Sequence, residues 1–304
     1  MTPPDVAESG RCHLVLLDVP VVLIADDPAL LATAASAYAD WTVEAPAAGS
    51  ALELRLALRD ASTEEVSAAI RVEGSQLTLA GGGIDGVADA DLGRARCDVP
   101  RRFVGDAAAL AAEVTDTLLL FLLTRTGGRA PLHAAGVMIG GTAMVLAGPS
   151  GAGKSTLALS AVRRGLAVLS EDTVYVQTVP ALRVWGFARP IHVLAAEAPP
   201  EVREFRLRGG RRKAVVPLPG GATGTRWADR ARLVLLSRGE RLAMTPVDRE
   251  VAVASLARLD EGFDLLAEQS AAAVRALAEA GAWRLTLTSD PGGAIDLLCR
   301  WAGG

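Results

Sequence analysis

The sequence predicts an α/β protein in two parts, a small α+β domain followed by a larger P-loop domain. Residues 148–155 read GPSGAGKS and stand between an apolar strand pattern and a helix pattern. Strand and helix patterns alternate after residue 130, whereas the first hundred residues are mostly strand patterns with one helix. The length of 304 residues suits two domains, and we expect them over residues 1–100 and 101–304.

Composition narrows the class of protein. The net charge of −4 offers no global basic field, so we expect neither nucleic acid nor a membrane as a partner. The three cysteines are far apart and form no CxxC or metal-binding spacing. The N-terminus shows no basic segment followed by an apolar run, and the apolar residues 117–124 are too few to span a bilayer. We therefore expect a cytoplasmic protein.

The first hundred residues read as strands around one helix. Residues 13–25 have a strand pattern, residues 28–41 a helix pattern, and the leucines of residues 52–58 alternate onto one face of a half-buried strand. Residues 69–83 predict a hairpin that turns near Gly74. None of these residues has the pattern of an active site, so we expect this domain to recognise a partner or to support the second domain.

The second domain is predicted to begin with a helix. That helix starts at Asp106, its expected N-cap, and ends at Gly127. Two strands then follow, joined by a tight turn at Gly140 and Gly141, and the second of them is apolar on both faces and so central. A helix that ends at Gly165 and a strand over residues 166–178 come next. Further strands are expected over 182–194, 232–237 and 283–289, and helices over 248–259, 264–281 and 293–302.

The motif at residues 148–155 is a full G-x-x-x-x-G-K-[ST] sequence in the strand–loop–helix context that the motif requires. Its glycines allow backbone amides to approach phosphate oxygens, and the N-terminus of the following helix favours negative charge. Lys154 would reach the terminal phosphates and Ser155 would hold Mg²⁺. The alternative, a glycine-rich turn that only caps a helix, fits the flanking pattern less well. The residues predicted to bind ATP are Gly148, Pro149, Ser150, Gly151, Ala152, Gly153, Lys154, Ser155 and Thr156.

Two adjacent carboxylates follow the next strand, at Glu171 and Asp172. One could hold Mg²⁺ and the other could take a proton from an attacking hydroxyl. A solvated strand end is the plain alternative. His133 stands at the head of the strand pair and could orient Glu171, although a lone histidine is more often a satisfied core or edge residue. His192 and His13 are weaker candidates for a catalytic histidine.

The chain has only two lysines, Lys154 and Lys213, because arginine supplies its other basic side chains. An ammonium is a compact charge that fits between phosphates, so Lys213 is predicted to meet a phosphate from the side opposite Lys154. Lys213 lies in a segment rich in glycine and arginine, which suits a lid that closes over phosphates or, alternatively, a solvated basic loop. Arg189 is a further candidate phosphate contact. The segment's other members are Arg206, Arg208, Gly209, Gly210, Arg211, Arg212, Gly220, Gly221 and Gly224.

Residues 132–176 resemble the kinase domain of HPr kinase/phosphorylase and its relatives. The matching features, in order and nearly in spacing, are His133, residues 148–155, Arg164 with Gly165, and the acidic pair. The resemblance implies a mixed-sheet P-loop fold akin to phosphoenolpyruvate carboxykinase and Mg-ATP-dependent phosphorylation of a serine hydroxyl. It also implies that Glu171 is the catalytic base and Asp172 the metal-side residue. It further implies a possible homo-oligomer.

The departures from that family bear on the substrate. The family's paired aspartates are Glu171 and Asp172 here, Thr156 stands where an acidic residue is often found, and the second signature of the family is not recognisable after Ile191. The chain looks more like the related kinases that accompany ribosomal peptide natural products, some of which phosphorylate a precursor peptide. We expect a serine of a peptide or protein as acceptor. The alternative is a nucleotide-switched ATPase or binding module that regulates a partner protein, and carboxykinase chemistry is less favoured.

Overall fold

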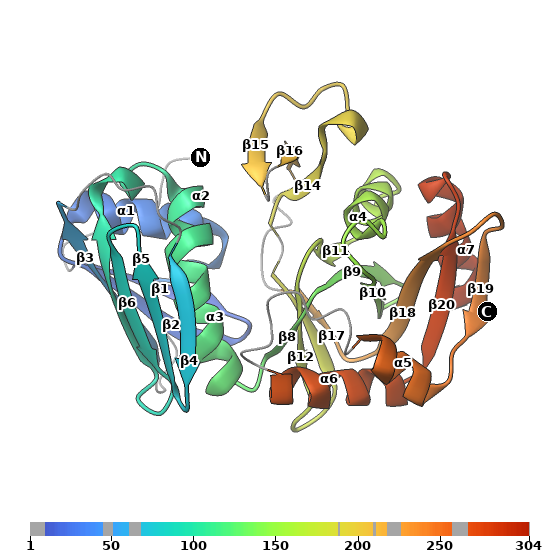
Figure 1. Ribbon diagram of the computed structural model, residues 1–304, viewed down its shortest axis with the longest axis horizontal. Coiled ribbons are helices and arrows are strands. Elements are labelled where there is room, and N and C mark those ends of the chain that lie inside the picture. Colours follow the sequence, from blue (N-terminus) through green and yellow to red (C-terminus); the bar gives the residue numbers. More distant parts are fainter. Residues whose placement is uncertain are drawn as a thin grey trace. The chain divides into compact units, whose positions relative to one another are not determined.

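The computed structural model divides the chain into two compact units, Met1–Gly128 and Arg129–Gly304 (Figure 1). The structure describes residues 10–44, 51–60, 68–187, 189–208, 211–217, 226–256 and 267–303. The boundary differs from the expected one at residue 100, because the helical segment over residues 107–125 belongs to the first unit.

A seven-stranded sheet forms the first unit, in the order β1-β2-β3-β7-β6-β5-β4. The pairs β2–β3 and β3–β7 are parallel and the others are antiparallel. The predicted strand over residues 13–25 is in fact a hairpin, with positive φ at Leu17 and Asp18, whereas the hairpin at Gly74 is confirmed. The strands are β1 (Arg11–Leu16), β2 (Val19–Ala25), β3 (Leu52–Arg59), β4 (Ala69–Glu73), β5 (Gln76–Gly81), β6 (Ile84–Asp89) and β7 (Arg94–Pro100).

The helices of the first unit pack on this sheet. Asp106 caps α2 by accepting a 3.0 Å hydrogen bond from the amide of Ala109, as its sequence position predicts. The hydroxyl of Tyr38, next to α1, donates to Asp116 at 2.6 Å, and α3 contacts β6 and β7. The helical segment thus completes the core of the first unit. The helical elements of the first unit are α1 (Pro28–Ala37), η1 (Ala39–Trp41), η2 (Arg101–Phe103), α2 (Ala107–Leu110), the π-helical turn η3 (Ala111–Thr115) and α3 (Asp116–Arg125).

The continuous helix Ala107–Arg125 corrects one expectation about length. With 19 residues it is long and apolar enough to cross a membrane by length and composition, whereas residues 117–124 alone are too short. Its leucines Leu118, Leu119 and Leu122 are fully buried against its own unit, as in the core helix of a globular domain. The cytoplasmic location stays a prediction.

A six-stranded mixed sheet forms the centre of the second unit, in the order β11-β9-β10-β18-β20-β19. The three strands β10, β18 and β20 are parallel and the other pairs are antiparallel. The tight turn between β9 and β10 is confirmed, with φ of 56° at Gly140 and 77° at Gly141, values that suit glycine. The strands are β9 (Ala134–Ile139), β10 (Thr142–Ala147), β11 (Val168–Ser170), β18 (Ala231–Arg238), β19 (Ala243–Pro246) and β20 (Ala282–Leu287).

Two layers cover this sheet (Figure 1). One face packs against α4 (Lys154–Arg163), α7 (Pro291–Gly303) and a three-stranded sheet. The other face packs against α5 (Arg249–Leu256), α6 (Ala267–Glu279) and a four-stranded sheet. The four-stranded sheet has the order β17-β13-β12-β8, with β8 (Ala130–Leu132), β12 (Val174–Gln177), β13 (Arg183–Gly186) and β17 (Arg226–Ala228). The result is the mixed α/β fold that the sequence predicts.

A three-stranded sheet stands where a basic loop around Lys213 is expected from the sequence. It consists of β14 (Ile191–Leu194), β15 (Phe205–Arg208) and β16 (Arg211–Val216), with η4 (Ala195–Glu197) after β14. Lys213 therefore lies on a strand, opposite Leu194 on one side and Arg206 on the other. Alternation explains the strand, because Ala214 and Val216 point into the core of the unit. The predicted glycines Gly209, Gly210, Gly220, Gly221 and Gly224 lie outside the described residues.

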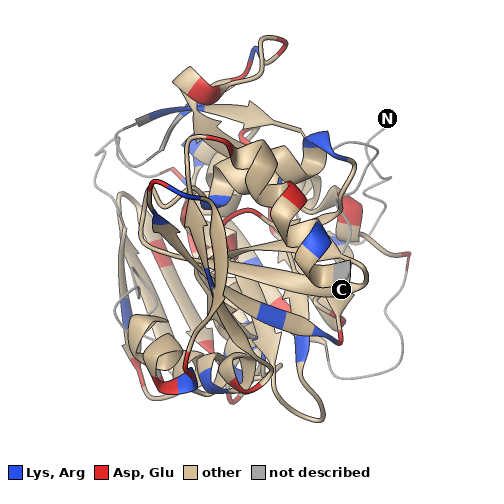
Figure 2. Ribbon diagram, turned by 90° about the vertical axis from the view of Figure 1, so that its right-hand side faces the viewer, with Lys and Arg blue, Asp and Glu red and all other residues tan. Residues whose placement is uncertain are grey.

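Positions of basic and acidic residues are interspersed along the ribbon in Figure 2. Several of them pair on the surface, as Arg164 does with Asp296 at 2.7 Å and Arg183 with Asp229 at 3.0 Å. Such exposed pairs contribute little to stability, about 0–1 kcal/mol each. The expected partners of the chain stay predictions.

Candidate functional site

The loop between β10 and α4 is built for a close backbone approach. Gly151 and Gly153 have φ of 79° and 110°, which side chains other than glycine adopt only with strain. A Cβ on Gly148 would lie 2.9 Å from that of Ala152, so this position also needs glycine. The helix begins at Lys154 and places its first amides at the loop. The arrangement is the strand–loop–helix geometry that suits an anionic ligand.

Lys154 is folded back into this loop. Its ammonium donates hydrogen bonds to the carbonyl oxygens of Gly148 at 2.7 Å and Pro149 at 3.3 Å, and the residue is 7% exposed. A buried ammonium needs such acceptors, because burial of an unpaired charge is costly. Phosphate oxygens could replace these carbonyls as its acceptors.

The end of β11 brings an acid to the start of α4. The hydroxyl of Ser155 donates a 2.6 Å hydrogen bond to Oε2 of Glu171, which directly follows β11. The other carboxylate oxygen, Oε1, lies 3.2 Å from both the backbone nitrogen and Nδ1 of His192 on β14. Because an ionised carboxylate only accepts hydrogen bonds, Nδ1 of His192 carries the proton in this contact. Three separate elements thus meet at one carboxylate.

Two opposing effects set the pKa of Glu171. Burial disfavours the charged form and by itself raises the pKa of the carboxyl, whose side chain is only 7% exposed. The hydrogen bonds from His192 and Ser155, with the charge of His192, outweigh burial, and the pKa of Glu171 lies below its usual value. Glu171 is therefore ionised at neutral pH.

Asp172 has a different environment from its neighbour. Its carboxylate oxygen Oδ1 lies 3.6 Å from Nδ1 of His133, and its side chain is 44% exposed. His133 lies beside Asp172 and His192 lies beside Glu171, and the expected role of His133 toward Glu171 stays a prediction. The adjacent acids are therefore distinct: Glu171 is buried and hydrogen-bonded to the first turn of α4, and Asp172 is accessible and lies beside a histidine.

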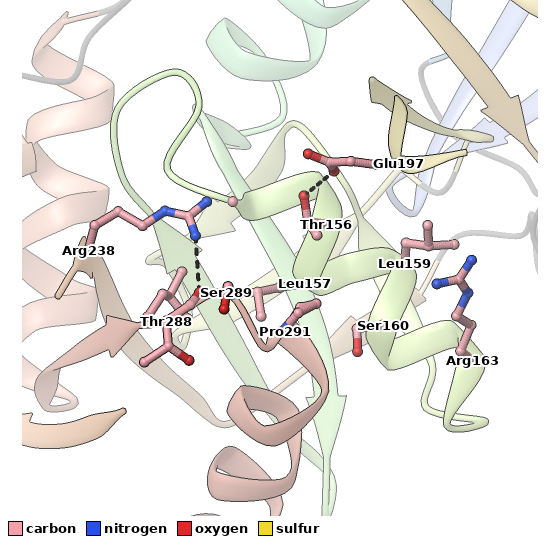
Figure 3. A pocket seen from close by; sticks show the side chains of 12 residues that line it. Thr156, Leu157, Leu159, Ser160, Arg163, Glu197, Arg238, Thr288, Ser289 and Pro291 are labelled. Carbon is pink, nitrogen blue, oxygen red and sulfur yellow. Dashed lines mark hydrogen bonds between the residues drawn. The ribbon is translucent and has the colours of Figure 1, made fainter. Parts of the chain in front are cut away.

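The remaining predicted residues make contacts of their own. Thr156 donates a 2.7 Å hydrogen bond to Glu197 at the end of η4 (Figure 3). The guanidinium of Arg189 stacks 4.8 Å from the ring centre of Phe187, just before β14. In the three-stranded sheet, Lys213 lies on the same face as His192, because residues paired across strands share a face and alternate along it.

From the sequence, His192 is only a weak candidate for a site residue and Glu197 is not a candidate. His192 follows the Arg189–Pro190 pair on an ordinary strand pattern, and only its distance to Glu171 across the fold reveals it. Glu197 lies in a short 3-10 turn far along the chain from Thr156. Neither residue has a local signal beyond its chemical type.

The oxygen atoms around Ser155 fit a magnesium ion. A hydroxyl and an ionised carboxylate that already lie 2.6 Å apart are hard oxygen donors of the kind that Mg²⁺ prefers. In the described ranges, no three or more histidine, cysteine, aspartate or glutamate side chains gather as a metal cluster. Mg²⁺ in nucleotide sites commonly takes only one or two protein carboxylates, with phosphates and waters completing its coordination.

No protein-family model matches the chain, and no curated protein matches it. Among solved structures, the chain is similar to the HPr(Ser) kinase/phosphatase from Coxiella burnetii, with 12% sequence identity and a TM-score of 0.32. The superposition covers 58% of this chain and 97% of that one.

Proposed function

We propose that this protein is an ATP-dependent phosphotransferase that moves the γ-phosphoryl group to a serine hydroxyl of a peptide or protein. The observation that carries the proposal is the contact of Ser155 with Glu171, next to a second, accessible carboxylate at Asp172. A phosphate-binding loop alone indicates a nucleotide site. Two acids with different environments beside it provide for both a metal ion and an attacking hydroxyl.

In this reaction, the loop at residues 148–155 and the start of α4 would bind the phosphates of ATP. Lys154 would exchange its contacts with Gly148 and Pro149 for phosphate oxygens, and the backbone amides of the loop would hold the remaining charge. Ser155 and Glu171 would hold Mg²⁺, which, when bound, neutralises charge on the phosphates during transfer. The low pKa of Glu171 supports this role, because a metal ligand must stay deprotonated.

Asp172 would accept the proton of the acceptor hydroxyl. This carboxylate is accessible to an acceptor, whereas Glu171 is enclosed by Ser155 and His192. His133 would orient Asp172 and stabilise its charge from 3.6 Å. This proposal reverses the roles that the family resemblance implies for the two acids.

Lys213 and Arg189 would contact the transferred phosphoryl group from the side opposite Lys154. Lys213 shares a face of its sheet with His192, and this face is opposite to the one through which Ala214 and Val216 pack into the core. Positive charge placed there would stabilise the transferring phosphoryl group. The peptide nature of the acceptor rests on the resemblance of residues 132–176, as does the possible homo-oligomer.

Transfer of label from γ-labelled ATP tests the proposal. The full chain, with Mg²⁺, is incubated with serine-containing peptides, and the variants Lys154→Ala and Asp172→Asn serve as negative controls. We expect labelled serine in the peptide with the wild-type chain and little with either variant. Release of inorganic phosphate alone, with no labelled acceptor, would reject the phosphotransferase and favour a nucleotide-switched ATPase that regulates a partner.

A further inference from the structure

A cavity of about 320 Å³ lies beside the phosphate-binding loop and has no part in the chemistry described above. Gly153, Thr156, Leu157 and Ser160 line it from the side of α4 (Figure 3). Its opposite wall comes from the ends of β18 and β20 and the start of α7. That wall consists of Arg238, Leu287, Thr288, Ser289 and Pro291. Its volume is within the range of small-ligand sites, about 300–1,000 Å³.

The position of the cavity follows from the strand order. The strands β10, β18 and β20 are parallel, so their carboxyl ends meet at one edge of the sheet, where ligands of α/β folds bind. Glu171 follows β11, which lies on the other side of β10 in the sheet. A ligand whose phosphates occupy the loop thus has the acids on one flank and this cavity on the other.

The lining combines apolar surface and hydroxyl groups with the charged side chains of Arg163, Glu197 and Arg238. Leu157, Leu287 and Pro291 offer apolar contacts, and Thr156, Ser160 and Ser289 carry hydroxyls. A nucleoside matches the apolar and hydroxyl parts of this lining, with a flat apolar base and a sugar that exchanges hydrogen bonds. The cavity also shares Gly153 and Thr156 with the predicted phosphate site, so one molecule could fill both.

Arg238 is held at the edge of this cavity. Its Nη1 donates a 3.2 Å hydrogen bond to the carbonyl oxygen of Thr288 (Figure 3). A Cβ built on Gly153 would lie 3.3 Å from its Nη2, so glycine at this position also leaves room for the guanidinium. A planar guanidinium fixed in this way offers a face on which an aromatic base can stack.

We propose that this cavity binds the nucleoside part of ATP, with Arg238 stacking on the base and the hydroxyls of Thr288 and Ser289 close to the sugar or base edge. The proposal rests on the proposed function, because it takes the loop at residues 148–155 as the triphosphate site. It assigns a specific surface to the part of the nucleotide that the motif does not describe.

Binding of two probes by calorimetry tests it: Mg-ATP and inorganic tripolyphosphate, both without an acceptor. For Arg238→Ala we expect the Kd for ATP to rise about 2- to 30-fold, as for the loss of one cation–π contact, with the Kd for tripolyphosphate unchanged. Arg238→Lys, which keeps the charge but loses the planar face, should lose most of the same ATP affinity. Ser289→Trp, which fills the cavity, should weaken ATP binding and spare tripolyphosphate.

Arg249→Ala is the matched control, because Arg249 lies on α5 at the other face of the sheet, pairs with Glu279 at 3.4 Å and should leave both affinities unchanged. Equal weakening of both probes by Arg238→Ala would make Arg238 a phosphate contact and overturn the proposal. Unchanged ATP binding in Arg238→Ala and Ser289→Trp, or a loss in Arg249→Ala, would place the nucleoside elsewhere. A wild-type chain that binds neither probe would instead reject the proposed function, and thermal unfolding of each variant verifies that it folds.

Discussion

The hydroxyl of Ser155 donates a 2.6 Å hydrogen bond to the Glu171 carboxylate and so joins the first turn of α4 to the end of β11. The next residue in the chain, Asp172, lies beside His133 instead. The two neighbouring acids therefore differ: Glu171 makes a buried contact with the first turn of α4, and Asp172 is accessible. The proposed division of labour between metal and proton rests on this difference.

Substitution of the two acids separates their roles. Asp172→Asn should lower the rate of phosphoryl transfer by about 10²- to 10⁴-fold, the typical contribution of a general base, with ATP affinity nearly kept. Glu171→Gln should raise the Mg²⁺ concentration needed for half-maximal transfer, because a ligand charge is lost. Transfer rates measured over a Mg²⁺ titration distinguish the two. If the effects are exchanged, Glu171 is the base, as the resemblance implies.

The lowered pKa of Glu171 predicts a dependence of stability on pH. A carboxyl whose pKa is lower in the folded state stabilises the fold above its unfolded pKa, and this contribution is lost as the pH falls through the folded pKa. Urea unfolding of the wild type and of Glu171→Gln from pH 7 down to pH 3 measures it. The stability of the second unit should fall less steeply with acid in the variant. Parallel curves would contradict the lowered pKa.

Substitution of Lys213 tests whether this lysine stabilises the transferring phosphoryl group. Lys213→Ala should lower the rate of transfer at saturating ATP while leaving ATP affinity nearly unchanged, since Lys154 and the loop hold the phosphates. Arg212→Ala is the matched control, because its guanidinium stacks 4.4 Å from the ring centre of Phe205 and its side chain points to the other face of the strand. Equal rates for the Lys213 variant and the wild type would make this lysine a solvated surface residue.

Gly186 supports the position of Glu171 from the neighbouring strand. A Cβ on this glycine would come within 2.7 Å of three backbone atoms of Leu169, two residues before Glu171. Gly186→Ala should therefore displace β11, destabilise the second unit by about 1–3 kcal/mol and reduce transfer. Gly74→Ala in the first unit is the control, since it strains a left-handed backbone in open space and should leave transfer unchanged. Unfolding curves and transfer rates are measured on both variants.

The cysteines offer a probe of the first unit. Cys97 on β7 is 2% exposed, and burial raises the pKa of its thiol to about 12. Because the thiolate is the reactive form, Cys97 should resist alkylation at pH 8 until the unit unfolds. Cys299 on α7 is more exposed and should be alkylated first. Mass spectrometry of partly labelled protein gives the order, and early labelling of Cys97 would contradict its burial.

Local patterns alone predicted much of the fold. The turns at Gly74 and Gly140, the cap at Asp106 and the helix stop at Gly165 are short-range choices of backbone conformation, and each lies where its residue type indicates. The basic segment around Lys213 was expected to be a loop because its charges hide the alternation of Ala214 and Val216. The boundary between the units depended on which sheet buries the helix over residues 107–125, and composition does not specify that partner.

The sequence by itself determined the motif at residues 148–155 and the acidic pair, because each is a contiguous set of residues whose spacing indicates the chemistry. Only the tertiary structure decided which acid contacts Ser155, which histidine accompanies each acid, and that Arg238 and Ser289 close a cavity beside Gly153. These contacts join residues from different strands and helices. Their distances follow from the order and direction of strands in the sheet, and no local pattern of residues records that order.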